Sequence, residues 1–215
     1  MANPFQTFDL PARPWVDLQR LQERFLALAS QCHPDALPST QGSPSPSLPD
    51  SPPAPHGTAA QADGEAAFRE LNEAHRTLQN PVTRIRSILE QEAPEQLAAA
   101  QQEGISLDLS DHFMDVATLL REAEAFCSQL ASTHSPLSKA ILRSEALALR
   151  SDLERTLARL DELWRQCEAQ LQAADAVWER RTPAILKQLA TVQKEMSFLQ
   201  RWRVQLREAR IRMSD

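Results

Sequence analysis

The sequence predicts an all-α protein: an N-terminal helical hairpin followed by an antiparallel three-helix bundle. Of the 215 residues only four are glycine and none is tyrosine, whereas Ala, Leu, Gln, Glu and Arg, which favour helices over strands, are abundant. Apolar residues recur at spacings of three and four along most of the chain. Two of the longest such segments follow a Ser-Pro or Thr-Pro pair, a typical helix start.

The first long helix is expected to run from Asp17 to Cys32. Asp17 is a good N-cap, and Val16 and Leu21 stand where a hydrophobic staple places its two apolar residues. One apolar stripe follows, formed by Leu18, Leu21, Phe25, Leu28 and Cys32. Pro34 lacks an N–H and restricts the residue before it, so it ends the helix and leaves His33 and Asp35 at the exit.

Residues 38–64 are predicted to form a disordered loop. They hold seven prolines, three of the four glycines and many serines, and such a composition offers little apolar surface to bury. The hairpin resumes over residues 65–90, where Phe68, Leu71, Ala74 or His75, and Leu78 share a face. Asn80-Pro81 interrupts this helix, after which Val82, Ile85 and Leu89 continue the stripe. We therefore expect one domain over residues 1–93 and a connector over 94–109.

Residues 110–215 are predicted to form the bundle, with coiled-coil-like packing of three long helices. Ser110 is expected to cap the first, Ser135-Pro136 opens the second, and Thr182-Pro183 opens the third. The first stripe comprises Phe113, Val116 or Ala117, Leu120, Phe126 or Cys127, and Leu130. The second comprises Leu142, Ala146, Leu149, Leu153, Leu157, Leu160, Trp164, Cys167 and Leu171. The third comprises Ile185, Leu189, Val192, Met196, Leu199 and Leu206.

Composition argues against several classes of protein. A net charge of −6 does not suit nucleic-acid binding, and we interpret the arginines of "RWRVQLREARIRM" as a solvated helix end rather than a phosphate site. We find neither a signal peptide nor a membrane span and expect a cytoplasmic protein. The three cysteines form no C-x-x-C pair, and no nucleophile motif, H-E-x-x-H or glycine-rich phosphate loop accompanies the five histidines. We expect no metal, no cofactor and no enzymatic activity.

A helix, His33-Pro34-Asp35, a long loop and a second helix together resemble the J domain of DnaJ-type co-chaperones, and in particular the HscB type of iron–sulfur cluster assembly. The F-x-x-F-x-L-P opening of that family appears as Phe5, Phe8, Leu10 and Pro11. Its H-P-L-x-R-A appears as Asn80, Pro81, Val82, Arg84 and Ile85. The second domain of the family is also a three-helix bundle, so the resemblance covers nearly the whole chain.

The resemblance implies that residues 1–93 are a J domain that stimulates ATP hydrolysis by a DnaK/HscA-type chaperone. His33, Pro34 and Asp35 would dock on that ATPase, with Asp35 accepting from an arginine of the partner. Arg20 and Arg24 would assist, although Asp17 and Glu23 offset their charge, and Ala36 stands where J domains usually carry a lysine. Electrostatic steering toward an acidic partner should therefore be weak.

The resemblance further implies that the bundle binds an iron–sulfur cluster scaffold through Phe113, Met114 and Phe198. Thr118, Arg121 and Ala125 occupy positions where the family leads us to expect glutamates. The three apolar residues would equally suit a bundle core, and the sequence leaves both interpretations open. The alternative function is a degenerate J-domain protein that acts as a helical docking platform without stimulating an ATPase.

Overall fold

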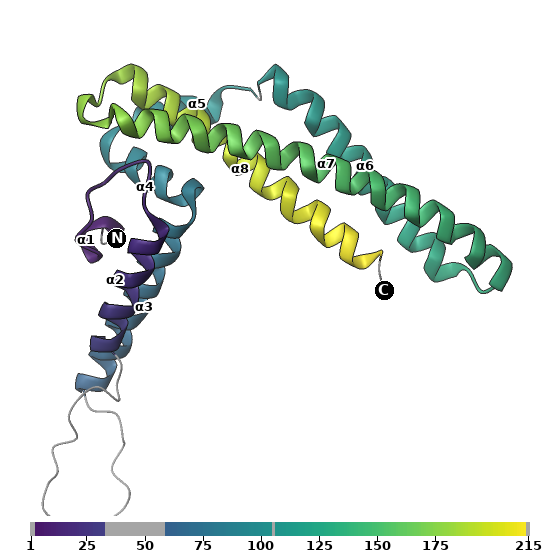
Figure 1. Ribbon diagram of the computed structural model, residues 1–215, viewed down its shortest axis with the longest axis horizontal. Helices are drawn as coiled ribbons and strands as arrows, with labels where there is room; N and C mark the ends of the chain where they lie inside the picture. The colour runs from purple at the N-terminus through teal and green to yellow at the C-terminus, as the bar shows by residue number, and fades with distance from the viewer. Residues whose placement is uncertain (1–2, 33–58, 105, 214–215) are drawn as a thin grey trace, which may run out of the picture. The chain divides into compact units, whose positions relative to one another are not determined.

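The computed structural model describes residues 3–32, 59–104 and 106–213, and all regular structure in these ranges is helical. The predicted all-α class is therefore confirmed. The chain forms two compact units, Met1–Ser87 and Ile88–Asp215 (Figure 1). None of the described helices has a stretch that is long and apolar enough to cross a lipid bilayer. The tripeptide His33-Pro34-Asp35 and most of the proline-rich segment lie outside the described residues.

The first unit is built on a hairpin of two helices. It contains α1 (Pro4–Thr7), α2 (Leu18–Cys32), α3 (Ala59–Gln79) and the first part of α4 (Pro81–Glu92). α2 packs along α3, and α1 packs on α3 as well (Figure 1). The apolar core of this unit consists of Phe5, Phe8, Leu21, Leu71, Ala74, Leu78, Val82 and Ile85. These residues come from all four helical segments, so the short α1 is part of the core.

The start of α2 follows the prediction, but its apolar stripe is narrower. Asp17 caps the helix, because its Oδ1 accepts from the backbone N–H of Gln19 at 2.9 Å and of Arg20 at 3.3 Å. Leu21 is fully buried, whereas Leu18, predicted to be in the core, is 51% exposed. The two lie about 60° apart around the helix, since each residue turns it by about 100°. That offset takes Leu18 off the face that contacts α3.

The second helix of the hairpin begins earlier than predicted. α3 starts at Ala59, so the last six residues of the segment predicted as a loop are helical. Ala59, Ala60, Gln61 and Ala62 are strong helix formers, and Gly64 costs only about 1 kcal/mol in a helix interior. Glycine therefore weakened the sequence signal without ending the helix. Beyond this point, the predicted break at Asn80-Pro81 is confirmed, because α3 ends at Gln79 and α4 begins at Pro81.

The second unit contains the predicted antiparallel three-helix bundle. It contains α6 (Leu107–Ser132), α7 (Pro136–Ala176) and α8 (Pro183–Arg212), each packed on the other two (Figure 1). Ion pairs show that α7 and α8 are antiparallel: Arg203 meets Asp161 at 2.6 Å, and Arg210 meets Glu154 at 3.9 Å. The fully buried leucines at its centre are Leu153, Leu160, Leu171, Leu189 and Leu206.

The helix starts of the bundle are predicted well where proline is present. Ser135 and Thr182 are the N-caps of α7 and α8, each followed by proline, and Thr182 accepts from the Ile185 backbone N–H. The predicted cap Ser110 is wrong: α6 begins at Leu107 after Ser106, and buried Leu109 extends its apolar face. The segment 94–109 also contains a helix, α5 (Pro94–Gln102), which packs on α8.

Candidate partner-binding surfaces

The exit of α2 leads directly to His33-Pro34-Asp35, since Cys32 is the last residue of the helix. The tripeptide itself lies outside the described residues. The structure describes the helix that precedes it, α2. α2 is capped at one end by Asp17 and held by the buried Leu21 against α3, so the polypeptide enters the tripeptide from a packed helix.

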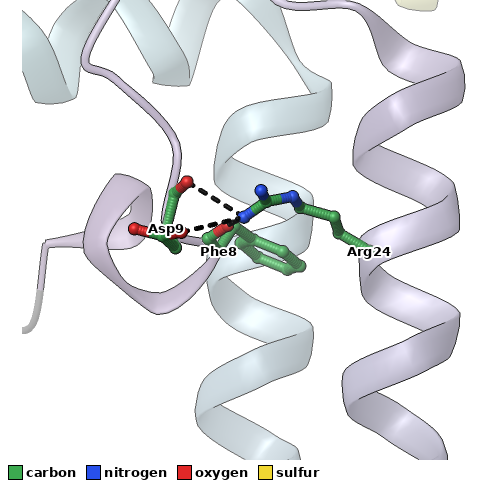
Figure 2. Close-up of polar contacts among 3 residues, drawn as sticks. All are labelled: Phe8, Asp9 and Arg24. Carbon is green, nitrogen blue, oxygen red and sulfur yellow. Dashed lines mark hydrogen bonds and ion pairs between the residues drawn. The ribbon is translucent and has the colours of Figure 1, made fainter.

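Arg24, predicted as a partner-binding cation, is engaged within the first unit. Its Nη1 donates to the carbonyl oxygens of Phe8 and Asp9, the latter at 2.9 Å, and lies 3.5 Å from the Asp9 carboxylate (Figure 2). Asp9 has a φ of 47°, in the left-handed region that non-glycine residues rarely adopt. Arg24 thus fixes the turn that follows α1.

Arg20 differs from Arg24, because its exposed side chain forms no ion pair with any residue in the described ranges. α2 also exposes two large apolar side chains, Leu18 and Leu26, and Trp15 is exposed just before the helix. Sequence analysis missed Leu26 because it lies outside the predicted stripe. The sequence signal that could have identified Leu26 is an apolar residue on a face of the helix that does not pack in the hairpin.

Of the three residues predicted to bind a client, Phe113 and Met114 lie on α6 and Phe198 lies on α8. Phe113 is 43% exposed and Met114 is 62% exposed, so neither is in the core. The ring centroid of Phe113 lies 6.1 Å from that of Trp202, and Phe198 lies 5.8 Å from the same ring. We call Phe113, Phe198 and Trp202 the aromatic cluster. Sequence analysis did not identify Trp202, although its spacing of four from Phe198 places both on one face of α8.

Met114 faces the other neighbour of α6. A groove of about 350 Å³ runs beside it between α6 and α7. Its polar lining comprises Asp115, Thr118, Asp152, Arg155, Thr156 and Arg159. Arg155 pairs with Asp152, and Arg159 lies 3.9 Å from Asp115. Both pairs are largely exposed, and exposed pairs contribute only about 0 to 1 kcal/mol, so a partner carboxylate can replace either acid.

The buried face of α6 is rotated relative to the predicted stripe. The core side chains are Leu109, Val116, Leu119, Ala123 and Phe126. Phe113 is more exposed because it stands at the edge of this face, on the side toward α8. Of the predicted alternatives, the structure therefore selects Val116 over Ala117 and Phe126 over Cys127.

Cys167 is a buried cysteine of the bundle core. Burial and the nearby Glu195 and Glu168 carboxylates raise the pKa of the Cys167 thiol to about 12, so it stays neutral. No group of three His, Cys, Asp or Glu side chains within the described ranges is arranged to hold a metal ion.

Comparison with known proteins points to one family. No protein-family model matches the chain. Its sequence is 28% identical over 160 residues to a co-chaperone HscB homolog of Bordetella parapertussis, covering 73% of this chain and 76% of that protein. It is 30% identical over 90 residues to the HscB homolog of Haemophilus ducreyi, covering 42% and 43% of the two chains. The chain is related to the HscB co-chaperones.

The fold agrees with this relationship. The chaperone HscB from Vibrio cholerae superimposes with a TM-score of 0.58 and 16% identity, covering 99% of both chains. The two sequence relatives and this shared fold together confirm the resemblance to HscB co-chaperones that the sequence indicated.

The family-like opening of the sequence has a structural explanation. Phe5 and Phe8, the two aromatics of the HscB-like F-x-x-F pattern, are each 1% exposed and anchor the segment before α2 to α3. Arg84 of the second pattern donates from Nε to the Pro14 carbonyl at 3.0 Å and from Nη1 to the Leu78 carbonyl at 2.7 Å. These residues hold the N-terminal segment against the hairpin.

Proposed function

We propose that this chain is a co-chaperone that uses His33, Pro34 and Asp35 to stimulate ATP hydrolysis by a DnaK/HscA-type chaperone. The observation that carries the proposal is the tripeptide directly after a capped and packed α2, in a chain related to HscB along most of its length. A cytoplasmic location is part of the same proposal.

The mechanism requires no bond-making step in this chain. The Asp35 carboxylate accepts hydrogen bonds from a partner arginine, and Pro34 restricts the backbone between Asp35 and His33. Binding favours the conformation of the ATPase that hydrolyses ATP, which is a population shift driven by differential affinity. Arg24 supports this surface indirectly by fixing the turn after α1, whereas Arg20 is available to the partner.

The test is a single-turnover ATPase assay with each DnaK-type chaperone of the same cell. The wild-type chain should accelerate hydrolysis by one of them. His33→Gln should reduce the rate to the unstimulated value while helix content and melting temperature stay nearly unchanged, because an exposed recognition group contributes little to folding. If His33→Gln unfolds the first unit, the histidine has a structural role and the proposal loses its main support.

The proposed client is an iron–sulfur cluster scaffold, bound by Phe113, Met114 and Phe198. Two of these apolar residues are exposed at the surface of the bundle, and exposed apolar anchors are costly in water unless a partner covers them. Phe113→Ser with Met114→Ser should weaken scaffold binding strongly and cost the bundle little stability. A docking platform without co-chaperone activity would bind the scaffold and leave every ATPase unstimulated.

A further inference from the structure

We propose that the client surface of this chain selects a segment that carries a carboxylate beside an apolar side chain. The inference rests on the proposed client binding and specifies the chemistry of the client. It concerns the outward face of α6, which we define as Met114, Thr118, Arg121 and Ala125. These residues lie within about 60° around the helix, at about 100° per residue, and none of them is buried.

Arg121 is the one charged residue of this face. Its side chain is exposed and forms no hydrogen bond or ion pair with any residue that the structure describes. The neighbours four residues away on the helix are Ala117 and Ala125, which cannot pair with it. Glu124 stands three residues on, yet no ion pair joins the two in the described chain. The guanidinium therefore presents its fork of donors to solvent.

The surroundings of Met114 add to the positive charge available to a ligand. Arg155 and Arg159 line the groove beside Met114, and among the described residues each pairs with one exposed aspartate. A carboxylate arriving in the groove can displace Asp152 or Asp115, because such exposed pairs are weak. The face and the groove beside it thus combine an apolar anchor, Met114, with three cations. Arg121 has no partner among the described residues, and the aspartate partners of Arg155 and Arg159 can be displaced.

The occupant that fits is an apolar segment with an acidic residue about two helical turns from its anchor. Met114 and Arg121 are seven residues apart, about 10 Å along the axis at 1.5 Å per residue. An arginine favours bidentate contact with a carboxylate, which also sets the register of the segment. A basic segment would face an uncompensated cation and be rejected.

The direct test uses two synthetic helical peptides of equal length and leucine content, one with glutamates and one with lysines at the polar positions. Fluorescence anisotropy with the full chain should show that the acidic peptide binds at least about tenfold more tightly, as an opposed charge pair predicts. Arg121→Glu should abolish this preference, and Arg121→Lys should keep most of it. Arg143→Glu makes the same charge change at another exposed position of the bundle and should leave the preference intact.

The outcomes separate this inference from the proposed function. Equal binding of the two peptides, binding of neither, or equal effects of Arg121→Glu and Arg143→Glu would overturn the inference. It would also be overturned if sedimentation showed the full chain dimerising through this face, with Arg121→Glu breaking the dimer. If Met114→Ser weakens scaffold binding and Arg121→Glu does not, the client surface stands without the charge selection. Stimulation of the ATPase, measured in the same variants, reports on the proposed co-chaperone activity alone.

Discussion

At the scale of single residues, Arg84 shows how a charged side chain can stabilise a core. It is 2% exposed, and its guanidinium donates to the carbonyls of Pro14 and Leu78. Leu78 is next to the last residue of α3, so its carbonyl has no partner within that helix. Arg84 thus caps the end of α3 and ties down the segment before α2.

Replacing Arg84 should therefore be costly. Arg84→Met keeps the aliphatic stem but leaves both carbonyls without their charged donor, and we expect a loss of about 2 to 4 kcal/mol in the free energy of unfolding. Urea denaturation of the full chain measures it. Arg20→Met removes an exposed arginine of the same unit and should change the free energy of unfolding by less than about 0.5 kcal/mol. Equal effects of the two variants would mean that the buried hydrogen bonds of Arg84 add nothing.

The family pattern in the sequence singled out Arg84. It did not predict which carbonyl groups Arg84 contacts. Its acceptor at Pro14 lies 70 residues away in the sequence. Pairings over such a separation depend on how α1 and the following segment pack on the hairpin, which no local pattern reports. Trp202 was missed for a related reason, since its contact with Phe113 joins two different helices.

At the scale of elements, His75 joins three segments of the first unit. Its ring stacks on Phe25 of α2 at 4.3 Å between centroids and lies 6.2 Å from that of Phe8, which follows α1. Burial lowers the pKa of His75 below its ordinary value of 6.5, because the charged imidazolium is less well solvated there. Protonation should therefore oppose the packing of α2 on α3.

The sign of the pH dependence follows from that pKa. With the folded-state pKa below the unfolded-state value of 6.5, the unfolded chain binds the proton first as pH falls. His75 contributes fully to the free energy of unfolding above about pH 7. This contribution decreases as pH falls through 6.5 to the lower folded-state pKa. His75→Phe, which preserves the stacking, should remove that part of the pH dependence. Urea denaturation at pH 7.5 and 5.5 gives the difference in the free energy of unfolding between the two pH values. If that difference is the same in His75→Phe as in the wild type, the assignment to His75 is wrong.

Helix boundaries were predictable where local chemistry marks them. Asp17, Asn80-Pro81, Ser135-Pro136 and Thr182-Pro183 all mark real starts or breaks, because capping and the missing proline N–H act within a few residues. The starts of α3 and α6 were placed too late. In α3, Gly64 made the first turns look like a loop although their helix propensity is high. In α6, Ser110 was the predicted cap although the helix begins at Leu107 after Ser106, and Leu109 is buried.

At the scale of the whole molecule, the sequence predicted two helical units, and its family resemblance suggested the division of labour between them. It left open whether Phe113 and Met114 belong to the core or to a surface, since a stripe spaced by three and four predicts a helix more firmly than it predicts the exact buried face. Packing of α6 on both α7 and α8 sets that face, and leaves Met114 outside it. Periodicity alone does not contain this rotation.

The two proposed activities should therefore be separable by mutation. His33→Gln should remove ATPase stimulation and leave scaffold binding within about twofold of wild type. Phe113→Ser with Met114→Ser should weaken scaffold binding and leave ATPase stimulation, measured without client, close to that of the wild type. The expectation rests on independence: the tripeptide follows α2 of the first unit, and the exposed pair lies on α6 of the second. Leu160→Ala, a change at a fully buried bundle residue, should instead cost about 2 to 5 kcal/mol and provides the reference for a true core position. A loss of bundle stability by the serine variant as large as that of Leu160→Ala would place Phe113 and Met114 in the core in solution and remove the proposed client surface.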